Sequence, residues 1–207
     1  MNNIYFTSDT HYHHKNIVRG TSEWEESQMA NQRTRDFDTL EEHDDTLVNN
    51  INSLVKENDV LWHLGDWAFG GHPKILEFSK RLNCRNIHLI FGNHDQHIEP
   101  VNSIYRPCFS SVQHYKELSF KIDSMKSGIY GKTKICLFHY GMRVWCQSHH
   151  QSILLYGHSH GTLPGIGRSM DVGVDTNNLY PYHLDEIIDR MRNLRNGVVD
   201  HHNELTN

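Results

Sequence analysis

Five short polar segments carry the side chains of this sequence that are best suited to bind metal ions. In chain order they are Asp9-Thr10-His11, Gly65-Asp66, Gly92-Asn93-His94-Asp95, His139 and Gly157-His158-Ser159-His160. Carboxylate, imidazole and amide groups are donors that divalent manganese, iron and zinc accept in proteins. The set is large enough for two ions, and a pair of divalent ions is suited to the hydrolysis of phosphate esters.

The spacing within these segments favours shared metal coordination. Asp9 and His11 are two residues apart, so on an extended chain their side chains point to the same side. His158 and His160 have the same spacing, although a loop there would send them to different ions. Asp66 follows a glycine in an expected tight turn, where its carboxylate is able to bridge two ions.

The segment from Gly92 to Asp95 also contains groups for proton transfer. Two divalent ions lower the pKa of a shared water and neutralise charge on the phosphoryl oxygens, but the leaving alkoxide still needs a proton. His94 follows Asn93, whose amide oxygen is a neutral ligand, and is placed to give that proton. Asp95 is expected to orient the imidazole of His94 and to raise its pKa.

Most of the five segments directly follow a run of apolar, β-forming residues. These runs cover residues 4–6, 60–64, 87–91, 135–138 and 153–156. A strand that ends in a metal ligand, repeated five times, is hard to obtain by accident, and open α/β sheets bind ligands at the carboxyl ends of their strands. The sequence therefore predicts an α/β fold with a dimetal site at those ends.

Helical patterns lie between several of these runs. Thr39 and Glu42 are typical of a capping box, and apolar residues at helical spacing follow, which predicts a helix over residues 39–57. Pro73 fits the first turn of a second helix, and residues 184–194 predict a third. These elements alternate with strands, as in α/β proteins.

The rest of the chain predicts short strands and a single domain. Residues 105–137 have the texture of antiparallel hairpins, and a last strand is expected around residues 170–174. We expect one domain over residues 1–195 and a polar C-terminal tail over residues 196–207.

Composition and charge set further limits. The chain has 207 residues, of which 37% are hydrophobic and 22% charged, as in ordinary globular proteins. Its formal net charge of -5 gives no strong nucleic-acid signal, although a local basic groove stays open. No apolar run approaches the roughly 20 residues of a membrane helix. Four cysteines without CxxC spacing and a strand close to the N-terminus favour reduced thiols, no signal peptide and a cytoplasmic location.

As an ordered set, Asp-x-His, Gly-Asp, Gly-Asn-His-Asp, His and Gly-His-x-His resemble the calcineurin-like metallophosphoesterase superfamily over residues 9–160. The resemblance implies a four-layer α/β/β/α sandwich of two mixed sheets flanked by helices. It implies that Asp9, His11, Asp66 and His160 hold one metal, and that Asp66, Asn93, His139 and His158 hold the second. It also makes His94 the general acid. Residues 6–11, 142–145 and 170–175 are similar to small phosphoesterases of bacteria and their phages.

Each segment taken alone has a structural alternative. A lone Asp-x-His is usually a surface or capping pair, and a lone Gly-Asp is mostly a turn. Gly-Asn-His-Asp alone is compatible with a loop whose side chains satisfy backbone groups, and His139 alone with a structural histidine at a strand end. Independent turns would not each supply the missing ligand in order, so the conjunction favours the dimetal site.

Candidates for substrate contacts lie outside the ligand set. Arg143 is suited to clamp a phosphate and Trp145 to stack on a base, but a salt bridge and a tryptophan tucked under its loop are equally compatible with the sequence. His13 is expected to line the pocket, with a solvated loop histidine as the alternative. Trp24, in a polar stretch expected to be a surface loop over residues 19–38, is a candidate lid or rim residue.

Together these features predict a dinuclear-metal-dependent phosphohydrolase. We expect a phosphodiesterase that acts on a small-molecule phosphate ester such as a nucleotide, through a metal-activated water with His94 as general acid. The ions are manganese, iron, zinc, nickel or cobalt, with manganese favoured. The alternatives are a phosphomonoesterase or protein phosphatase and, less favoured, a nuclease, a non-catalytic binding scaffold or a His-rich metal store.

Overall fold

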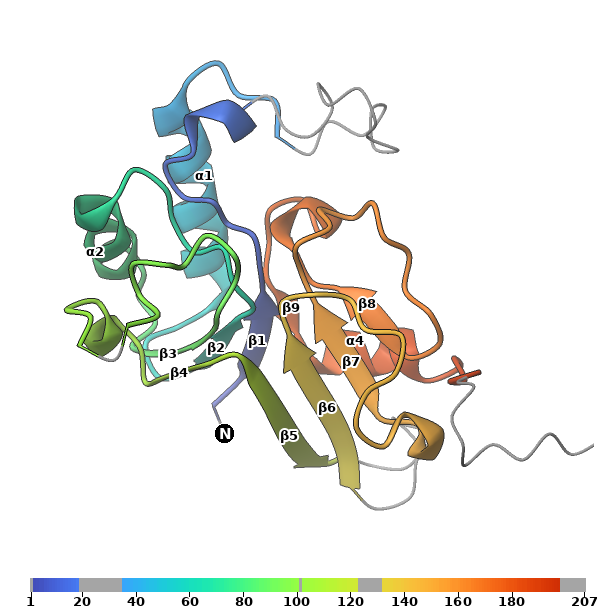
Figure 1. Ribbon diagram of the computed structural model, residues 1–207. Helices are drawn as coiled ribbons and strands as arrows, with labels where there is room; N and C mark the ends of the chain where they lie inside the picture. The colour runs from blue at the N-terminus through green and yellow to red at the C-terminus, as the bar shows by residue number, and fades with distance from the viewer. Residues whose placement is uncertain (1, 19–34, 101, 123–131, 198–207) are drawn as a thin grey trace, which may run out of the picture.

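The computed structural model describes residues 2–18, 35–100, 102–122 and 132–197, which form two mixed β-sheets and three α-helices (Figure 1). In spatial order, the first sheet contains β4 (Ser111–Gln113), β3 (Asn86–Ile90), β2 (Val60–His63), β1 (Ile4–Thr7) and β9 (Tyr182–His183). Strands β1 to β4 are parallel, and β9 pairs with β1 in the antiparallel sense.

The second sheet contains β5 (Tyr115–Lys121), β6 (Lys132–Phe138), β7 (Ile153–Tyr156) and β8 (Ser169–Asp171) in this order. Strand β5 is antiparallel to β6, while β6, β7 and β8 are parallel. The antiparallel pairing expected over residues 105–137 is therefore confirmed for β5 and β6, whose connection lies outside the described residues, but β4 in the same stretch is parallel to β3 and belongs to the first sheet.

Within the described residues, three α-helices and four short 3-10 helices accompany the sheets. They are α1 (Leu40–Leu54), α2 (His72–Arg81), α4 (Leu184–Met191), η1 (Lys15–Ile17), η3 (Arg106–Cys108), η4 (Ser148–His150) and η5 (Val174–Thr176). The side chain of Thr39 caps α1 by accepting the backbone N–H of Glu42 at 3.1 Å, as the sequence predicts. The helix ends at Leu54, before the expected residue 57, because Val55 is already extended.

Alternating strand residues fill three successive layers of core. In β1, Tyr5 packs under α1 and α2, while Phe6 faces the space between the two sheets. In β7, Leu155 faces that same space and Leu154 faces the outer side of the second sheet. Successive strand side chains point to opposite faces, so sheets buried on both faces require the continuous apolar runs seen in the sequence.

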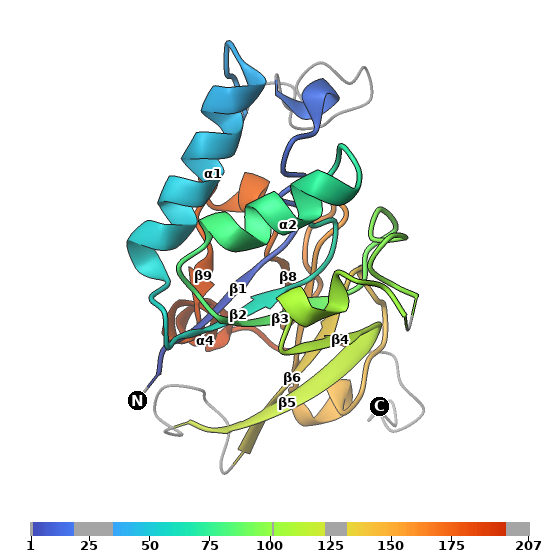
Figure 2. The ribbon, with the colours of Figure 1, turned by 90° about the vertical axis from the view of Figure 1, so that its left-hand side faces the viewer.

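The layers follow the order of the expected sandwich. Helices α1 and α2 lie side by side over the outer face of the first sheet (Figure 2). The second sheet packs against the inner face, and α4 adds apolar side chains to this central core beside β1 and β9. The loop that carries Trp145, next to η4, covers the outer face of the second sheet. Among the described residues, none of the helices has the length and apolar content needed to span a membrane.

The structure corrects three local expectations. The strand expected over residues 170–174 ends at Asp171, because Asp171 accepts the N–H of Gly173 at 2.7 Å and the chain turns into η5. Arg35, at the end of the polar stretch expected to be a surface loop, is fully buried; Trp24 lies outside the described residues. Asn196, the first residue of the expected tail, is buried and bonded to the carbonyl oxygens of Ser148 and Ser152.

Candidate metal centre

Loops from both sheets meet at the carboxyl ends of their strands. The loops after β1, β2 and β3 carry Asp9, His11, Asp66 and Asn93, and those after β6 and β7 carry His139, His158 and His160 (Figure 1). A parallel bridge between Ser8 and Gly173 joins the two sheets at this point. The seven expected ligands therefore converge although they span 152 positions of the chain, from residue 9 to residue 160.

Six of the seven expected ligands form two clusters. Donor atoms of Asp9, His11 and His160 lie within 4.8 Å of one another, and so do those of Asp66, His139 and His158. Oδ2 of Asp66 is 3.4 Å from Nε2 of His11 and 3.6 Å from Nε2 of His139, so this carboxylate lies between the clusters.

The seventh ligand, Asn93, belongs to the second cluster. Its Oδ1 lies 3.1 Å from Nε2 of His139. The side chains are grouped in space as the resemblance implies, with Asp66 between the clusters, and their roles as metal ligands stay predictions.

The donor set fits a pair of divalent ions. Oδ1 of Asp9 and both ring nitrogens of His11 are buried without a hydrogen-bond partner in the described structure, a costly arrangement that a cation relieves. Nδ1 of His139 donates to the carbonyl of Leu64 at 2.7 Å, and Nδ1 of His160 bonds to Asp175 at 2.8 Å. Both rings therefore keep Nε2 for a metal.

The backbone at the ligands is held in an uncommon conformation. Five of the seven ligands have positive φ, between 44° and 67°: Asp9, His11, Asp66, His158 and His160. Few non-glycine residues adopt this left-handed region, and such residues cluster at functional sites where the surrounding structure enforces them. The loops are thus shaped for the ligands at the expense of local stability.

Two glycines of the motifs allow the loops to approach one another. A Cβ on Gly92 would lie 2.3 Å from Oδ1 of Asp66, and a Cβ on Gly157 would lie 2.4 Å from Oδ2 of Asp9. Any side chain at these positions would displace a ligand carboxylate. The glycines before Asn93 and His158 are therefore needed for space.

Burial dominates the electrostatics of the centre. It raises the pKa of Asp9 to about 7, and the nearby carboxylates of Asp171 and Asp66 add to this rise. Burial, together with the charge of Arg35, holds the pKa of His11 well below its ordinary value. Burial alone would lower the pKa of His160 as well, but its hydrogen bond to Asp175 and the charges of Asp175 and Asp9 together outweigh burial, so the pKa is raised.

Behind the ligands lies a buried ion pair that the sequence did not reveal. Arg35 donates to both oxygens of Asp175, at 2.9 and 2.7 Å, and to the carbonyl oxygens of Asp9 and Thr10. Asp175 in turn holds His160. The position of Asp175 just past the last expected strand was the one available signal, while Arg35 lies in a polar stretch without periodicity.

His94 lies at the mouth of the centre. Its side chain is exposed, its ring centroid is 5.6 Å from that of His11 and 4.6 Å from that of Phe69, and its backbone N–H donates to Oδ1 of Asp66 at 3.0 Å. A group with this position is able to reach both substrate and solvent.

Asp95 has a different position from the one expected. It is buried, and its oxygens accept the backbone N–H groups of Asp66 at 2.9 Å, Trp67 at 3.0 Å and Gly92 at 2.8 Å. Burial raises its pKa to about 6. In place of the expected contact with the imidazole of His94, the structure gives Asp95 a positioning role that ties two ligand loops together.

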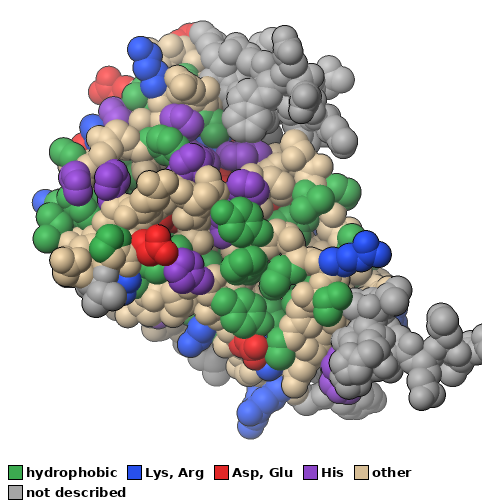
Figure 3. Space-filling model, viewed as in Figure 1, with side chains coloured by type: hydrophobic (Ala, Val, Ile, Leu, Met, Phe, Trp, Pro, Cys, Tyr) green, Lys and Arg blue, Asp and Glu red, His purple; other side chains and the backbone are tan. Residues whose placement is uncertain are grey.

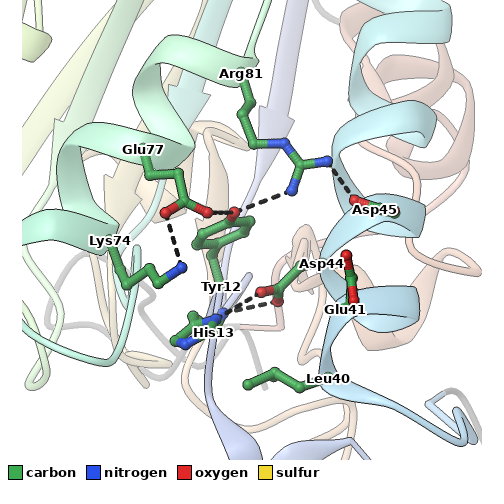
Figure 4. Close-up of a pocket in the computed structure, with 9 residues that line it drawn as sticks. All are labelled: Tyr12, His13, Leu40, Glu41, Asp44, Asp45, Lys74, Glu77 and Arg81. Atoms are coloured by element: carbon green, nitrogen blue, oxygen red, sulfur yellow. Dashed lines mark hydrogen bonds and ion pairs between the residues drawn. The ribbon is translucent and has the colours of Figure 1, made fainter.

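Two of the three candidate substrate contacts lie away from the centre. Trp145 is buried against Cys136 and Leu154, and its indole N–H donates to the carbonyl of Ser152, so it is not available to stack on a base. His13 bonds to Asp44 and faces a separate cavity of about 470 Å³ between α1 and α2 (Figure 4).

That separate cavity is lined by charges that pair with one another. Tyr12 donates to Glu77 at 2.6 Å and accepts from Arg81, while Lys74 pairs with Glu77 (Figure 4). The third candidate, Arg143, is exposed next to a smaller apolar cavity and makes no hydrogen bond or ion pair within the described residues.

Comparison with known proteins gives a family match over most of the chain. Residues 3–171 match the model of the calcineurin-like phosphoesterase superfamily domain. The chain is 32% identical to an uncharacterized protein of Methanocaldococcus jannaschii over 98 residues, which are 46% of this chain and 48% of that protein. It is 34% identical to the gene 66 protein of Mycobacterium phage L5 over 97 residues, 46% of this chain and 41% of that protein. The matches thus span less than half of these relatives.

Among solved structures, a protein of unknown function from Aquifex aeolicus has a similar fold. The two share 20% sequence identity with a TM-score of 0.60, and the match covers 90% of this chain and 98% of the other. At this identity the comparison supports the architecture of two sheets and their helices.

Proposed function

The chain belongs to the calcineurin-like phosphoesterase superfamily, whose members are metal-dependent phosphoesterases, and from this premise we propose that it is a phosphodiesterase. Its substrate would be a small nucleotide or a similar small phosphate ester. The position of the Asp66 carboxylate between two ligand clusters is the observation that best supports the proposal, because two divalent ions in one site suit phosphate ester hydrolysis.

The proposed roles of the residues follow from their positions. Asp9, His11 and His160 would hold one ion, Asn93, His139 and His158 would hold the other, and Asp66 would contribute to both. When bound, the ions supply an activated water and offset the charge on the phosphoryl oxygens. His94, exposed beside His11, donates a proton to the leaving oxygen.

Two features support a small diester as substrate. Arg143 is exposed in the loop that follows His139 and makes no hydrogen bond or ion pair within the described residues, and a guanidinium is a good partner for a phosphate. The formal net charge of -5 offers no general attraction for long nucleic acid. We propose manganese as the metal among the divalent ions that this donor set accepts, and the four free thiols support a cytoplasmic location.

The diesterase proposal is tested by comparing two aryl substrates on the manganese-loaded protein. We expect bis(p-nitrophenyl) phosphate to be hydrolysed with a higher kcat/KM than p-nitrophenyl phosphate. Hydrolysis of the monoester alone would show a phosphomonoesterase, and a salt-sensitive cut of single-stranded DNA would show a nuclease.

The acid role of His94 is tested by the His94→Ala variant. We expect kcat to fall by about 10²- to 10⁴-fold on a diester with an alkyl leaving group, and by less on one that releases p-nitrophenolate, which leaves without a proton. Metal content, measured by elemental analysis, is expected to stay the same.

The matched control for this variant is His97→Ala. His97 is also exposed and lies three residues further along, but its ring packs on His72. Equal loss of kcat in the two variants, or unchanged activity in His94→Ala, would refute the acid role.

A further inference from the structure

A small apolar cavity lies beside the metal centre. It has a volume of about 190 Å³, and its lining includes Met142 and Arg143 from the loop after β6, Tyr156 at the end of β7, and Leu163 and Ile166 from the loop after His160. Hydrophobic side chains gather next to histidines on this face of the molecule (Figure 3).

The loops that form the cavity are the same loops that carry the ligands of the second cluster. The ring of Tyr140 lies 4.9 Å from that of His139 and 4.7 Å from that of His158. The next residue, Gly141, lines the cavity, and its wall is closed by a hydrogen bond from Tyr156 to the carbonyl of Leu163 at 2.8 Å. The cavity is therefore formed by residues that directly follow or precede ligand segments, Gly141 after Tyr140 and Tyr156 before Gly157.

The cavity and the ring of His94 have different neighbours. The ring of His94 packs near His11 and Phe69, whereas the loop that lines the cavity from Gly141 onward follows Tyr140, whose ring packs on His158. Because the general acid must face the leaving group, the group that stays on phosphorus is the one directed toward the cavity.

Size and lining indicate one aromatic ring as the occupant. A cavity of roughly 150 Å³ lined by aliphatic and aromatic side chains is enough for benzene, and Leu163 and Ile166 are 47% and 59% exposed in the absence of a ligand. Arg143, unpaired at the same cavity, is positioned for the charge of a phosphate or for the face of a ring.

We propose that this cavity binds the aromatic ring of the group that stays on phosphorus, a nucleobase or a simple aryl ring. The proposal rests on the proposed phosphodiesterase function and assigns specificity to Leu163 and Ile166. Truncation of these exposed side chains changes the cavity without removing buried core.

The kinetic test compares esters that share one leaving group. Wild type is expected to prefer bis(p-nitrophenyl) phosphate over methyl p-nitrophenyl phosphate, and the kcat/KM ratio is expected to fall about tenfold in the Leu163→Ser/Ile166→Ser variant. Thymidine 5′-(p-nitrophenyl) phosphate is the third substrate. If its kcat/KM falls more in the double variant than that of bis(p-nitrophenyl) phosphate, a nucleobase is the preferred ring.

A matched control separates the cavity from the surrounding surface. Val144 is 47% exposed in the same loop as Arg143 but does not line the cavity. Val144→Ser is expected to keep the wild-type ratio. The proposal is overturned if the double variant loses kcat/KM equally on all substrates, or if the kcat/KM ratio falls equally in the Val144→Ser control.

A binding measurement makes the proposal independent of turnover. We expect the manganese-loaded wild type to bind phenylphosphonate about tenfold more tightly than methylphosphonate in calorimetry, and the double variant to lose this preference. Diester hydrolysis without any aromatic preference would overturn the cavity proposal and leave the phosphodiesterase intact. A preserved phenyl preference with no diester hydrolysis would refute the function and leave the ring site standing.

Discussion

At the base of the metal centre, Asp9 and His11 keep polar atoms buried without hydrogen-bond partners in the described part of the chain, on a backbone of positive φ. Each unsatisfied buried group costs about 1–3 kcal/mol, and each strained residue costs on the order of 1 kcal/mol. These residues oppose folding of the metal-free chain, and the ions that we propose for this site would offset that cost. The same burial makes metal binding depend on pH.

Asp9 leads to a prediction about this dependence. Its pKa of about 7 means that it carries a proton in the metal-free protein below neutral pH. Metal must displace that proton, so we expect manganese affinity to weaken by up to about tenfold per unit as the pH falls below 7. Titration calorimetry at pH 6 and pH 7.5, in buffers of different ionisation enthalpy, measures the affinity and the released proton.

The stability of the metal-free protein changes in the opposite direction. The pKa of Asp9 lies above its ordinary value of 3.8, so between about pH 4 and 7 the native state holds a proton that the unfolded state has lost. Its contribution to stability is therefore present at low pH and is lost as the pH rises through 7. For the affinity prediction, an equal manganese affinity at pH 6 and pH 7.5 would contradict the raised pKa of Asp9.

At the scale of elements, one buried arginine connects parts of the chain that the sheets do not join. Arg35 precedes α1 and pairs with Asp175 in η5, which holds His160 after β7. On its other side, Arg35 contacts His43 in α1, which bonds to Asp44. The first cluster of ligands is thus fixed from behind by α1 and η5.

Replacing this arginine is expected to affect both stability and metal binding. Arg35→Met removes one charged partner of the buried Asp175, which keeps its bond to His160, and we expect a loss of about 3–5 kcal/mol of unfolding free energy. Without that support, manganese affinity is expected to fall about 10- to 100-fold. Urea denaturation and metal titration give the two quantities.

A surface arginine provides the control for this experiment. Arg192 pairs with Asp189 across one turn with both side chains exposed, so Arg192→Met is expected to change the unfolding free energy by less than about 1 kcal/mol. If Arg35→Met were as mild as Arg192→Met, the pair behind His160 would have no positioning role.

In the whole molecule, the metal centre lies where the two sheets meet. Ligands from β1, β2 and β3 and ligands from β6 and β7 would bind the same pair of ions, and Asp66 of the first sheet lies within 3.6 Å of His139 of the second. Bound ions would therefore link the sheets across their shared apolar core. Metal binding and the stability of the domain would therefore be coupled.

Removal of metal is accordingly expected to lower the melting temperature. Free manganese at 100 times its Kd would stabilise the native state by about 2.7 kcal/mol, which for a domain of this size corresponds to about 5–10 °C. Calorimetric scans with manganese and with a chelator measure the shift. Calcium, which prefers oxygen ligands, serves as the control, and an equal shift with both ions would argue against the histidine-rich centre as its cause.

The features predicted from the sequence are those written in short stretches of chain. The apolar runs predict the strands because a strand that is buried on both faces needs a continuous run of apolar residues. Thr39 predicts the start of α1 because a capping side chain bonds to the backbone of the first helical turn. The metal ligands belong to the same class, since Asp66 and Asn93 follow directly after their strands.

The rest depends on contacts between distant residues, which only the tertiary structure decides. Arg35 and Asp175 are 140 positions apart, and neither has a local pattern that announces the other. Asp95 is next to His94 in sequence but holds the backbone of Asp66, because its carboxylate reaches the neighbouring loop. Residue order thus determined which groups are available for metal chemistry. The packing of the two sheets decided which of these groups meet and which residues support them, because the loops that carry the groups are brought together by a shared core.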